Sequence, residues 1–332
     1  MRVVAYYPAI VVNNQYKPAH LHEKLLNIYT HFYKERIRLK PLSKGDKKIK
    51  GIVDAYKLIL NSCFGRFGSM DSWLFDAQTM FSVTLTGELS LLMLIEAFEQ
   101  NGINVISANS DGVTTMFQKS KLELKQSIVK EWEKLTNFEI ETVRFKWFKY
   151  LNVNSYIACT QEDKYKYKNV FVSDVELYKN PSKRIIPLAL QQYFINGIKP
   201  EDFISSHKDI LDFCIRGKAN SSTSLFLKYD NGELIDVGSL IRYYLTKDNK
   251  APQLFKVGTG TKDNDIDSNQ NAPNELGIQR VKLFNKIIDG PYNIDYEQYI
   301  YQTYKIIAKI EKNKKDLNYV DSILNKNQLS LF

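Results

Sequence analysis

Cysteine is scarce in this sequence, and the residues present lie far apart. Cys63, Cys159 and Cys214 contain no closely spaced pair of the kind that binds zinc, and an odd number of cysteines does not make a disulfide framework. This usage is typical of a reducing, intracellular environment. The pattern argues against a disulfide-stabilised fold and against a zinc-binding module.

Long apolar runs are also lacking. No uninterrupted apolar stretch approaches the roughly 18 residues that span a bilayer. The N-terminus lacks the basic, apolar and small-residue order of a signal peptide, and no internal repeat is visible. We therefore expect a protein of the cytoplasm that has no membrane partner.

What the sequence does contain is length, positive charge and aromatic residues. Its 332 residues are enough for one large domain or two to three smaller ones, and 44% of them are hydrophobic. The net charge of +9 favours an acidic polymer as partner, and this alone leaves nucleic acid and anionic lipid both open. Aromatic residues make up 13% of the chain, with 21 Tyr and 18 Phe.

Hydrophobic periodicity predicts an α+β organisation. A strand and a turn are expected at the start of the chain. Helices are expected at 19–39, 49–63, 76–101 and 119–136, and strands at 103–108, 113–117, 138–146 and in 150–180. Helices are expected to dominate 186–310, a polar loop to cover 258–277, and the tail after Lys312 to fray.

The stretch from Lys57 to Gly68 contains the first chemical signal. Lys57 and Asn61 are four residues apart and lie on one helix face, with Ser62 beside them and Gly65 allowing close approach of another molecule. A cation and an amide at a helix end suit the phosphate and the base or sugar of a nucleotide. The alternative is an ordinary amphipathic helix that stops at a glycine.

The turn 109–112 carries the second signal. An aspartate at a hairpin turn, here Asp111, is held on rigid strands and is a good ligand for Mg²⁺, which prefers oxygen ligands. The alternative is a plain type I′ turn, in which Asp-Gly is a favoured pair.

Two basic segments are further candidates for binding phosphate. Arg36 and Lys40 share a helix face, with Arg38 between them, and either a triphosphate site or a solvated basic face explains them. Lys164, Lys166 and Lys168 alternate with tyrosines, as on a surface that follows a nucleic-acid backbone or on an ordinary exposed strand whose tyrosines point inward.

The order of these segments resembles the polymerase part of family B DNA polymerases. That family's first motif resembles Asp-x-x-Ser-Leu-Tyr-Pro, and Val3 and Tyr6-Tyr7-Pro8 match it here. Its second motif resembles Lys-x₃-Asn-Ser-x-Tyr-Gly-x-x-Gly, and the segment 57–68 matches it. The turn 109–112 stands at the third motif, Asp-Thr-Asp-Ser, and Asn154-Ser155-Tyr156 at the fourth, Lys-x-Tyr. The pattern is most similar to bacteriophage members, including those of large gut phages.

The resemblance implies an α+β right hand. Its palm would contain an antiparallel sheet, its fingers a helical hairpin and its thumb mostly helices, while the proofreading exonuclease domain would be absent. The implied division is palm at 1–18, fingers at 19–68, palm again at 69–150, and the palm–thumb junction with the thumb at 151–332. The gaps between the motifs are too short for the insertions of protein-primed members, so priming by a nucleic-acid 3′-end is expected.

The implied activity is DNA-directed DNA synthesis of the phage replicative type, in the cytoplasm of a bacterial host. Two Mg²⁺ ions, or Mn²⁺ in their place, would support transfer of dNMP from a dNTP to the primer 3′-hydroxyl. Asp111 would be a catalytic metal ligand, and Asn109 a weak one in place of the first third-motif aspartate.

The resemblance also assigns residues to nucleotide and DNA. Lys57, with Arg36 and Lys40, would hold the triphosphate, and Tyr7 would lie under the sugar. The residues implied at the nascent base pair and along the primer–template DNA are Asn61, Ser62, Gly65, Tyr156, Lys164, Lys166 and Lys168.

One departure from the family pattern is serious. The first-motif aspartate, which binds both metals, falls at Arg2, and the motif serine falls at Ala5. A cation at about 4 Å from a metal costs several kcal/mol even at an effective dielectric of 20. We expect either a C-terminal polymerase part that needs a separate N-terminal polymerase/exonuclease chain, or a catalytically inactive remnant that binds primer–template DNA. A basic membrane-surface protein is a third alternative, and no basic amphipathic helix supports it.

Overall fold

A computed structural model describes residues 1–175, 179, 181–258, 280–286 and 290–311 of the chain. The chain divides into two compact units, which we call unit 1, Met1–Arg144, and unit 2, Phe145–Phe332. Each unit has its own cluster of buried apolar side chains. The two units are therefore described separately.

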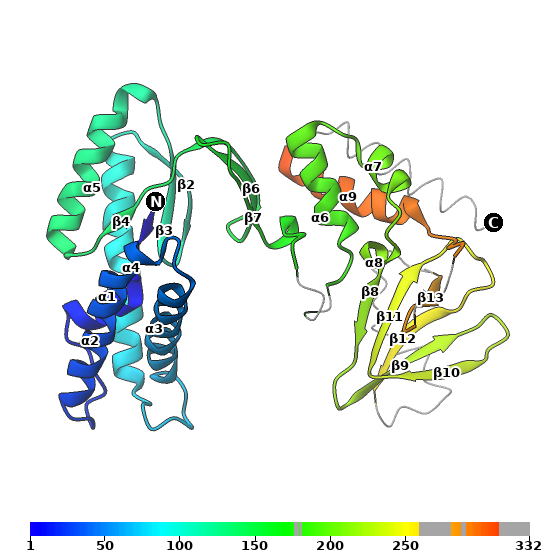
Figure 1. Ribbon diagram of the computed structural model, residues 1–332, viewed down its shortest axis with the longest axis horizontal. Coiled ribbons are helices and arrows are strands. Elements are labelled where there is room, and N and C mark those ends of the chain that lie inside the picture. Colours follow the sequence, from blue (N-terminus) through cyan, green and yellow to red (C-terminus); the bar gives the residue numbers. More distant parts are fainter. Residues whose placement is uncertain (176–178, 180, 259–279, 287–289, 312–332) are drawn as a thin grey trace. The chain divides into compact units, whose positions relative to one another are not determined.

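Unit 1 combines five helices with a four-stranded antiparallel sheet among its described elements (Figure 1). Its helices are α1 (Tyr6–Asn13), α2 (Lys24–Leu39), α3 (Lys47–Arg66), α4 (Ala77–Gln100) and α5 (Leu122–Thr136). Its strands are β1 (Arg2–Val3), β2 (Asn104–Asn109), β3 (Gly112–Met116) and β4 (Ile140–Glu141), in the order β2-β3-β1-β4.

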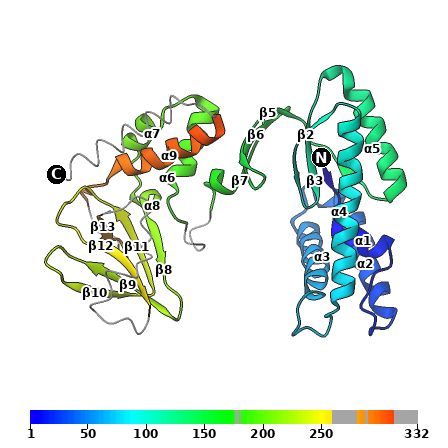
Figure 2. The same ribbon diagram turned by 180° about the vertical axis from the view of Figure 1, so that it is seen from behind.

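The core of unit 1 forms where α1 packs against α4. Seen from behind in Figure 2, α4 runs beside α5. Gly87 of α4 lets the helices approach closely, since a Cβ there would lie 3.2 Å from Ile10 and 3.5 Å from Tyr6. The Tyr6 hydroxyl donates to the Gly87 carbonyl at 2.6 Å. This contact fixes the segment that carries Tyr7.

Helix α4 is long and apolar enough to cross a membrane by length and composition, the one such helix among the described residues. One of its faces packs in the unit 1 core through Val83, Leu91, Leu94 and Phe98. Another face exposes apolar side chains, namely Phe81, Leu85, Leu89, Leu92 and Met93. Because α4 supplies core contacts to a compact unit, we describe it as a core helix with one uncovered apolar face.

The sequence predicted the helices of unit 1 well and its last strand less well. The segments 19–39, 49–63, 76–101 and 119–136 correspond to α2, α3, α4 and α5. At the start of the chain, the expected strand and turn are present at residues 2–3 and 4–5, and helix α1 follows them. The strand expected at 138–146 is wrong as one element, since β4 has two residues and a further strand begins at Phe145.

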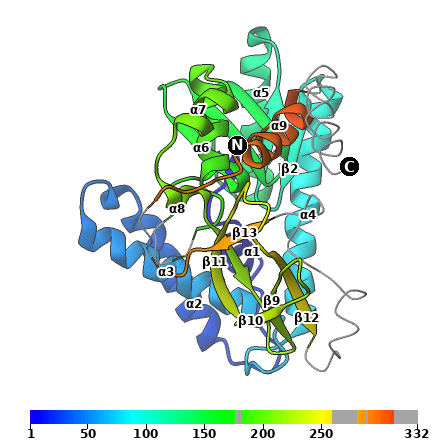
Figure 3. The same ribbon diagram turned by 90° about the vertical axis from the view of Figure 1, so that its right-hand side faces the viewer.

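Unit 2 contains three separate antiparallel three-stranded sheets and a group of helices among its described elements (Figures 1 and 3). The sheets have the orders β5-β6-β7, β13-β11-β8 and β10-β9-β12. Their strands are β5 (Phe145–Asn152), β6 (Ser155–Thr160), β7 (Tyr165–Lys168), β8 (Ile215–Lys218), β9 (Thr223–Lys228), β10 (Leu234–Gly238), β11 (Leu240–Leu245), β12 (Gln253–Gly258) and β13 (Val281–Leu283).

The helices of unit 2 are α6 (Ile185–Gln191), α7 (Pro200–Ser206), α8 (Ile210–Phe213) and α9 (Tyr296–Glu311), and a π-helical turn, Gln192–Asn196, continues α6. Their buried face contributes Leu190, Phe213 and Tyr299 to the core. Tyr299 connects α9 to α8 and β11, because its hydroxyl donates to the Phe213 carbonyl at 2.7 Å and accepts from the Leu245 amide at 3.1 Å.

The α+β prediction is confirmed, and the mostly helical second half is wrong. The described residues between Ile215 and Leu283 form six strands, inside the segment expected to be helical. Strand β11 lacks polar–apolar alternation at its end, since Tyr243, Tyr244 and Leu245 are all buried. A buried strand of this kind resembles a short helical segment in sequence. The polar loop expected at 258–277 and the tail after Lys312 lie almost wholly outside the described residues.

Candidate functional site

The hairpin between β2 and β3 places Asp111 beside Arg2. Residues 110 and 111 form the two-residue turn, and Asn109 pairs with Gly112. Ser110 has a positive φ of 47°, whereas Asp111 does not, so the turn is not the type I′ alternative, which requires φ > 0 at both positions. The carboxylate of Asp111 accepts from Arg2 Nε at 2.6 Å.

The position of Arg2 follows from how β1 enters the sheet. Arg2 is paired with Gly112 of β3 on one side and with Glu141 of β4 on the other. Gly112 permits this pairing, because a Cβ at that position would lie 2.9 Å from the Met1 carbonyl oxygen. The Val3 amide also donates to the Asp111 carbonyl at 2.7 Å. The sheet therefore holds a guanidinium next to the turn carboxylate.

Tyr7 connects this hairpin to helix α3. Its ring stacks on Phe64 with centroids 4.6 Å apart and planes 10° from parallel. Burial raises the pKa of Tyr7, and the negative charge of Asp111 acts in the same direction. Tyr7 is thus a half-buried neutral phenol that lies between the end of α3 and the Asp111 turn.

Helix α3 presents the predicted nucleotide-facing residues to solvent. Lys57, Asn61, Ser62 and Gly65 are all exposed. Asp46 begins the helix by accepting from the amides of Lys48 and Ile49. Phe64 packs on Tyr7, and this contact turns the neighbouring face with Asn61 and Gly65 outward. A Cβ on Gly65 would meet no atom within 4 Å, so the space above it is open.

Arg36 of α2 is the most unusual basic group of unit 1. Its Nε is buried and has no hydrogen-bond partner among the described residues. Burial lowers the pKa of Arg36, and the positive charge of Arg2 adds to that effect. Nearby Lys40 forms an ion pair with Glu141 of β4. By contrast, Arg38 is largely exposed and pairs with Glu35 at 2.7 Å, so it takes no part in this cluster.

The residues at this sheet do not fit a two-magnesium centre. Arg2 occupies the strand position where the family resemblance requires a carboxylate, and Asp111 is already paired with it. No group of three His, Cys, Asp or Glu side chains that could hold a metal ion gathers anywhere in the described part of the chain. Asn109 is half-buried and accepts from the Ser110 hydroxyl at 3.1 Å. We therefore derive no catalytic step through a metal ion.

The remaining predicted DNA-binding residues lie in unit 2, on the sheet β5-β6-β7. Tyr156 pairs with Lys168 across the sheet and stacks near Phe148, with ring centroids 4.9 Å apart. Lys166 lies over the Phe145 ring at 5.9 Å. Because directly opposed residues share a face, Tyr156, Lys166 and Lys168 lie on the same side of this sheet.

The third lysine and the tyrosines of this segment are also exposed. Lys164 belongs to the turn before β7, where its amide donates to the Thr160 hydroxyl at 3.2 Å. Tyr165 and Tyr167 oppose the buried Cys159 and Ile157, on the other face of the sheet from Lys166 and Lys168, and are 43% and 37% exposed. The sheet thus offers cations and aromatic rings to solvent.

Sequence reasoning missed two contacts of the site. Neither the Arg2–Asp111 ion pair nor the Tyr7–Phe64 stack joins residues that are close in sequence, and both depend on how β1 and α1 pack. The sequence contained a weak signal for the Arg2–Asp111 ion pair. Arg2 stands where the family motif has an aspartate, and an arginine close to a turn aspartate tends to form an ion pair with it.

The fold is similar to that of a known DNA polymerase. The family B DNA polymerase from the hyperthermophilic archaeon Pyrobaculum calidifontis matches with a TM-score of 0.50 and 13% sequence identity. The match covers 92% of this chain and 44% of the polymerase, so this chain spans less than half of that protein's length. No protein-family model and no curated protein sequence matches. At this identity the similarity is one of fold.

Proposed function

We propose that this protein holds primer–template DNA together with a deoxynucleoside triphosphate, in the manner of a DNA polymerase. The observation that carries the proposal is Arg36, a half-buried guanidinium that lies near Arg2 and whose Nε has no hydrogen-bond partner in the described part of the chain. A buried donor without an acceptor is costly, and a phosphate oxygen would satisfy it. The similarity of fold to a family B DNA polymerase supports the same function.

Other groups of unit 1 suit the rest of a nucleotide. Lys57 on α3 supplies a mobile cation for the triphosphate, and Tyr7, stacked on Phe64, supplies a flat surface for the sugar. The open space over Gly65 leaves room for a base pair. In unit 2, the exposed face with Tyr156, Lys166 and Lys168 suits a DNA backbone, because cations contact phosphates and rings stack on bases.

Nucleotidyl transfer is the second candidate, and Asp111 beside Tyr7 favours it. In this form the protein would be a DNA-directed DNA polymerase of phage replicative type in a bacterial cytoplasm. Asp111 and Asn109 would hold Mg²⁺ or Mn²⁺ once a further carboxylate, from a separate N-terminal chain, displaced Arg2. Because Arg2 pairs with Asp111 in this chain, binding without catalysis is the function we favour.

The test uses full-length protein, a primer with a dideoxy 3′-end, and titration of the dNTP complementary to the template. Arg36→Met and Lys57→Ala should each weaken template-dependent dNTP binding by roughly tenfold, because each removes a charged contact to phosphate. Arg38→Met and Lys48→Ala are matched controls, since Arg38 pairs outward with Glu35 and Lys48 lies on the opposite side of α3.

DNA affinity provides the second half of the test. Lys166→Ala/Lys168→Ala should weaken binding of the primer–template and reduce its dependence on salt, since two phosphate contacts disappear. The proposal fails if Arg36→Met and Lys57→Ala both bind dNTP with wild-type affinity. It also fails if the affinity for a dNTP does not depend on whether it is complementary to the template base.

A further inference from the structure

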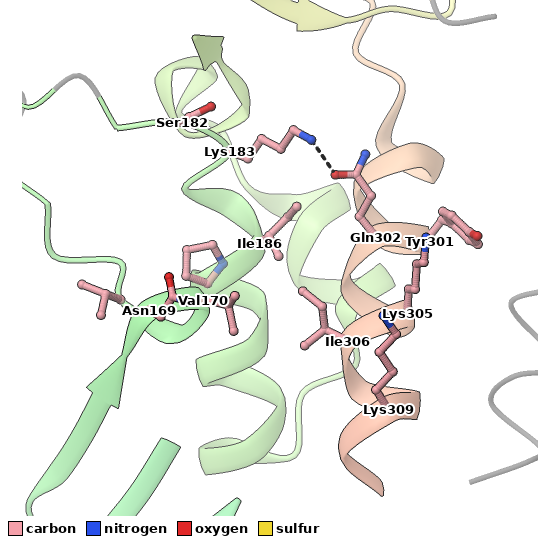
Figure 4. A pocket seen from close by; sticks show the side chains of 12 residues that line it. Asn169, Val170, Ser182, Lys183, Ile186, Tyr301, Gln302, Lys305, Ile306 and Lys309 are labelled. Carbon is pink, nitrogen blue, oxygen red and sulfur yellow. Dashed lines mark hydrogen bonds between the residues drawn. The ribbon is translucent and has the colours of Figure 1, made fainter. Parts of the chain in front are cut away.

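Unit 2 contains a cavity of about 600 Å³ that the DNA-binding proposal does not use. It opens between α6, α9 and the short turn Asn169–Phe171 (Figure 4). Its volume lies within the range of cavities that bind small organic molecules. Ile186, Pro187 and Ile306 form part of its lining and are apolar.

The polar part of the lining is basic. Lys183 comes from the segment before α6, and Lys305 and Lys309 come from α9. None of the described residues that line the cavity is acidic. Lys305 and Lys309 are four residues apart on one helix face, and neither forms an ion pair with another described residue. Several lysines in a lining whose described residues include no carboxylate favour a ligand that carries several negative charges.

Gln302 adds a buried donor to these cations. The residue is 7% exposed, and its Oε1 accepts from Lys183 Nζ at 3.0 Å, the hydrogen bond drawn in Figure 4. Its Nε2 is buried and has no partner among the described residues. The Gln302 carboxamide oxygen already accepts from Lys183, and Nε2 can act only as a donor. A ligand that satisfies Nε2 must therefore supply a hydrogen-bond acceptor.

The backbone at Lys183 is held in an unusual conformation. Its φ is 52°, in the left-handed region that residues with a side chain seldom adopt. The Lys183 amide donates to the Cys214 carbonyl at 2.8 Å, which fixes this conformation. Such strain persists where the surrounding structure imposes it, and it is concentrated at binding sites. In this backbone conformation, the Lys183 ammonium group donates a hydrogen bond to Gln302.

We propose that this cavity binds a free nucleoside di- or triphosphate. The lysines and the Gln302 amide would contact the phosphates, and the apolar lining would contact the base and sugar. A polyphosphate chain carries three to four negative charges, which matches three lysines better than the single charge of a backbone phosphate. This site is separate from the residues of unit 1 and does not depend on the proposed function.

The experiment measures binding of dATP to full-length protein by equilibrium dialysis, without DNA and with EDTA. Lys305→Ala/Lys309→Ala should weaken binding by at least roughly tenfold, because two charge-assisted contacts are lost. The matched control Lys199→Ala/Lys218→Ala removes the same charge from exposed positions of unit 2 and should bind as the wild type does. Gln302→Glu should also abolish binding, since it replaces the donor with an anion. Thermal unfolding of each variant verifies that it is folded.

Pyrophosphate should compete with dATP for this DNA-independent binding. Equal affinity of the lysine variant and its control would overturn the proposal, as would dATP binding that pyrophosphate does not displace. Binding of a short single-stranded oligonucleotide but not of dATP would overturn it in favour of a DNA strand. Since the dNTP test of the proposed function requires a template, failure of one proposal is distinguishable from failure of the other.

Discussion

Arg2 decides the chemistry that unit 1 can support. Its side chain is 69% exposed, so its ion pair with Asp111 contributes little to stability, about 0–1 kcal/mol for an exposed pair. The pair matters because it neutralises the carboxylate that a divalent cation would require. Under the proposed function, this one residue of a two-residue strand allows nucleotide binding but not metal-dependent transfer.

Replacing Arg2 tests this separation directly. Arg2→Asp should place a second carboxylate beside Asp111 and raise the affinity of unit 1 for Mn²⁺ by at least roughly tenfold, since carboxylate oxygens are its preferred ligands. Electron paramagnetic resonance of free Mn²⁺ measures the binding. Arg2→Ala, which removes the cation but adds no ligand, is the control. Mn²⁺ binding by the wild type as tight as that of Arg2→Asp would contradict this account.

Helix caps determine where the elements that carry the site begin. Asp76 is the N-cap of α4, and its carboxylate accepts from the Thr79 amide at 3.1 Å and from the Ala19 amide at 2.8 Å. These backbone hydrogen bonds lower the pKa of Asp76. The carboxylate thus joins the segment before α2 to the start of α4.

Substitution of this cap has a pH-dependent result. Asp76→Ala should lower the free energy of unfolding by about 1 kcal/mol at pH 7, the usual effect of losing an N-cap. Because the pKa of Asp76 is lower in the folded protein, its contribution is present above the ordinary pKa of 3.8 and disappears as the pH falls below it. Urea unfolding of both proteins at pH 7, 5 and 3 measures this. A difference that persists unchanged at pH 3 would rule out the carboxylate as its origin.

At the scale of the whole molecule, the two units have separate cores. Leu94 is 1% exposed in the core of unit 1, and Leu190 is fully buried in that of unit 2. This separation implies that damage to one core need not spread to the other. It also means that the predicted nucleotide-facing residues of unit 1 and the cavity of unit 2 are supported by the packing of different cores.

Hydrogen exchange can test the independence of the units. Leu94→Ala should cost about 2–5 kcal/mol by leaving a cavity, and it should speed amide exchange in residues 1–144 only. Leu190→Ala should have a similar energetic cost and should speed amide exchange only in the described part of unit 2. Faster exchange throughout the chain in either variant would show that the two cores unfold together.

The sequence alone determined the elements and motifs whose physics is local. The helices of unit 1 were predictable because their apolar residues repeat at helical spacing, and the hairpin at 109–112 because a turn signal separates two strand-like runs. The exposed positions of Lys57 and Asn61 also follow from spacing along one helix.

Only the tertiary structure decided which of these groups meet. The pairing of β1 with β3 brings Arg2 to Asp111, and the packing of α1 brings Tyr7 to Phe64. In unit 2, Lys183 and Gln302 are 119 residues apart in sequence and make one hydrogen bond. Their contact depends on long-range packing of α9 against α6, which local periodicity does not encode. The same reason explains why the buried strands between Ile215 and Leu283 were mistaken for helices.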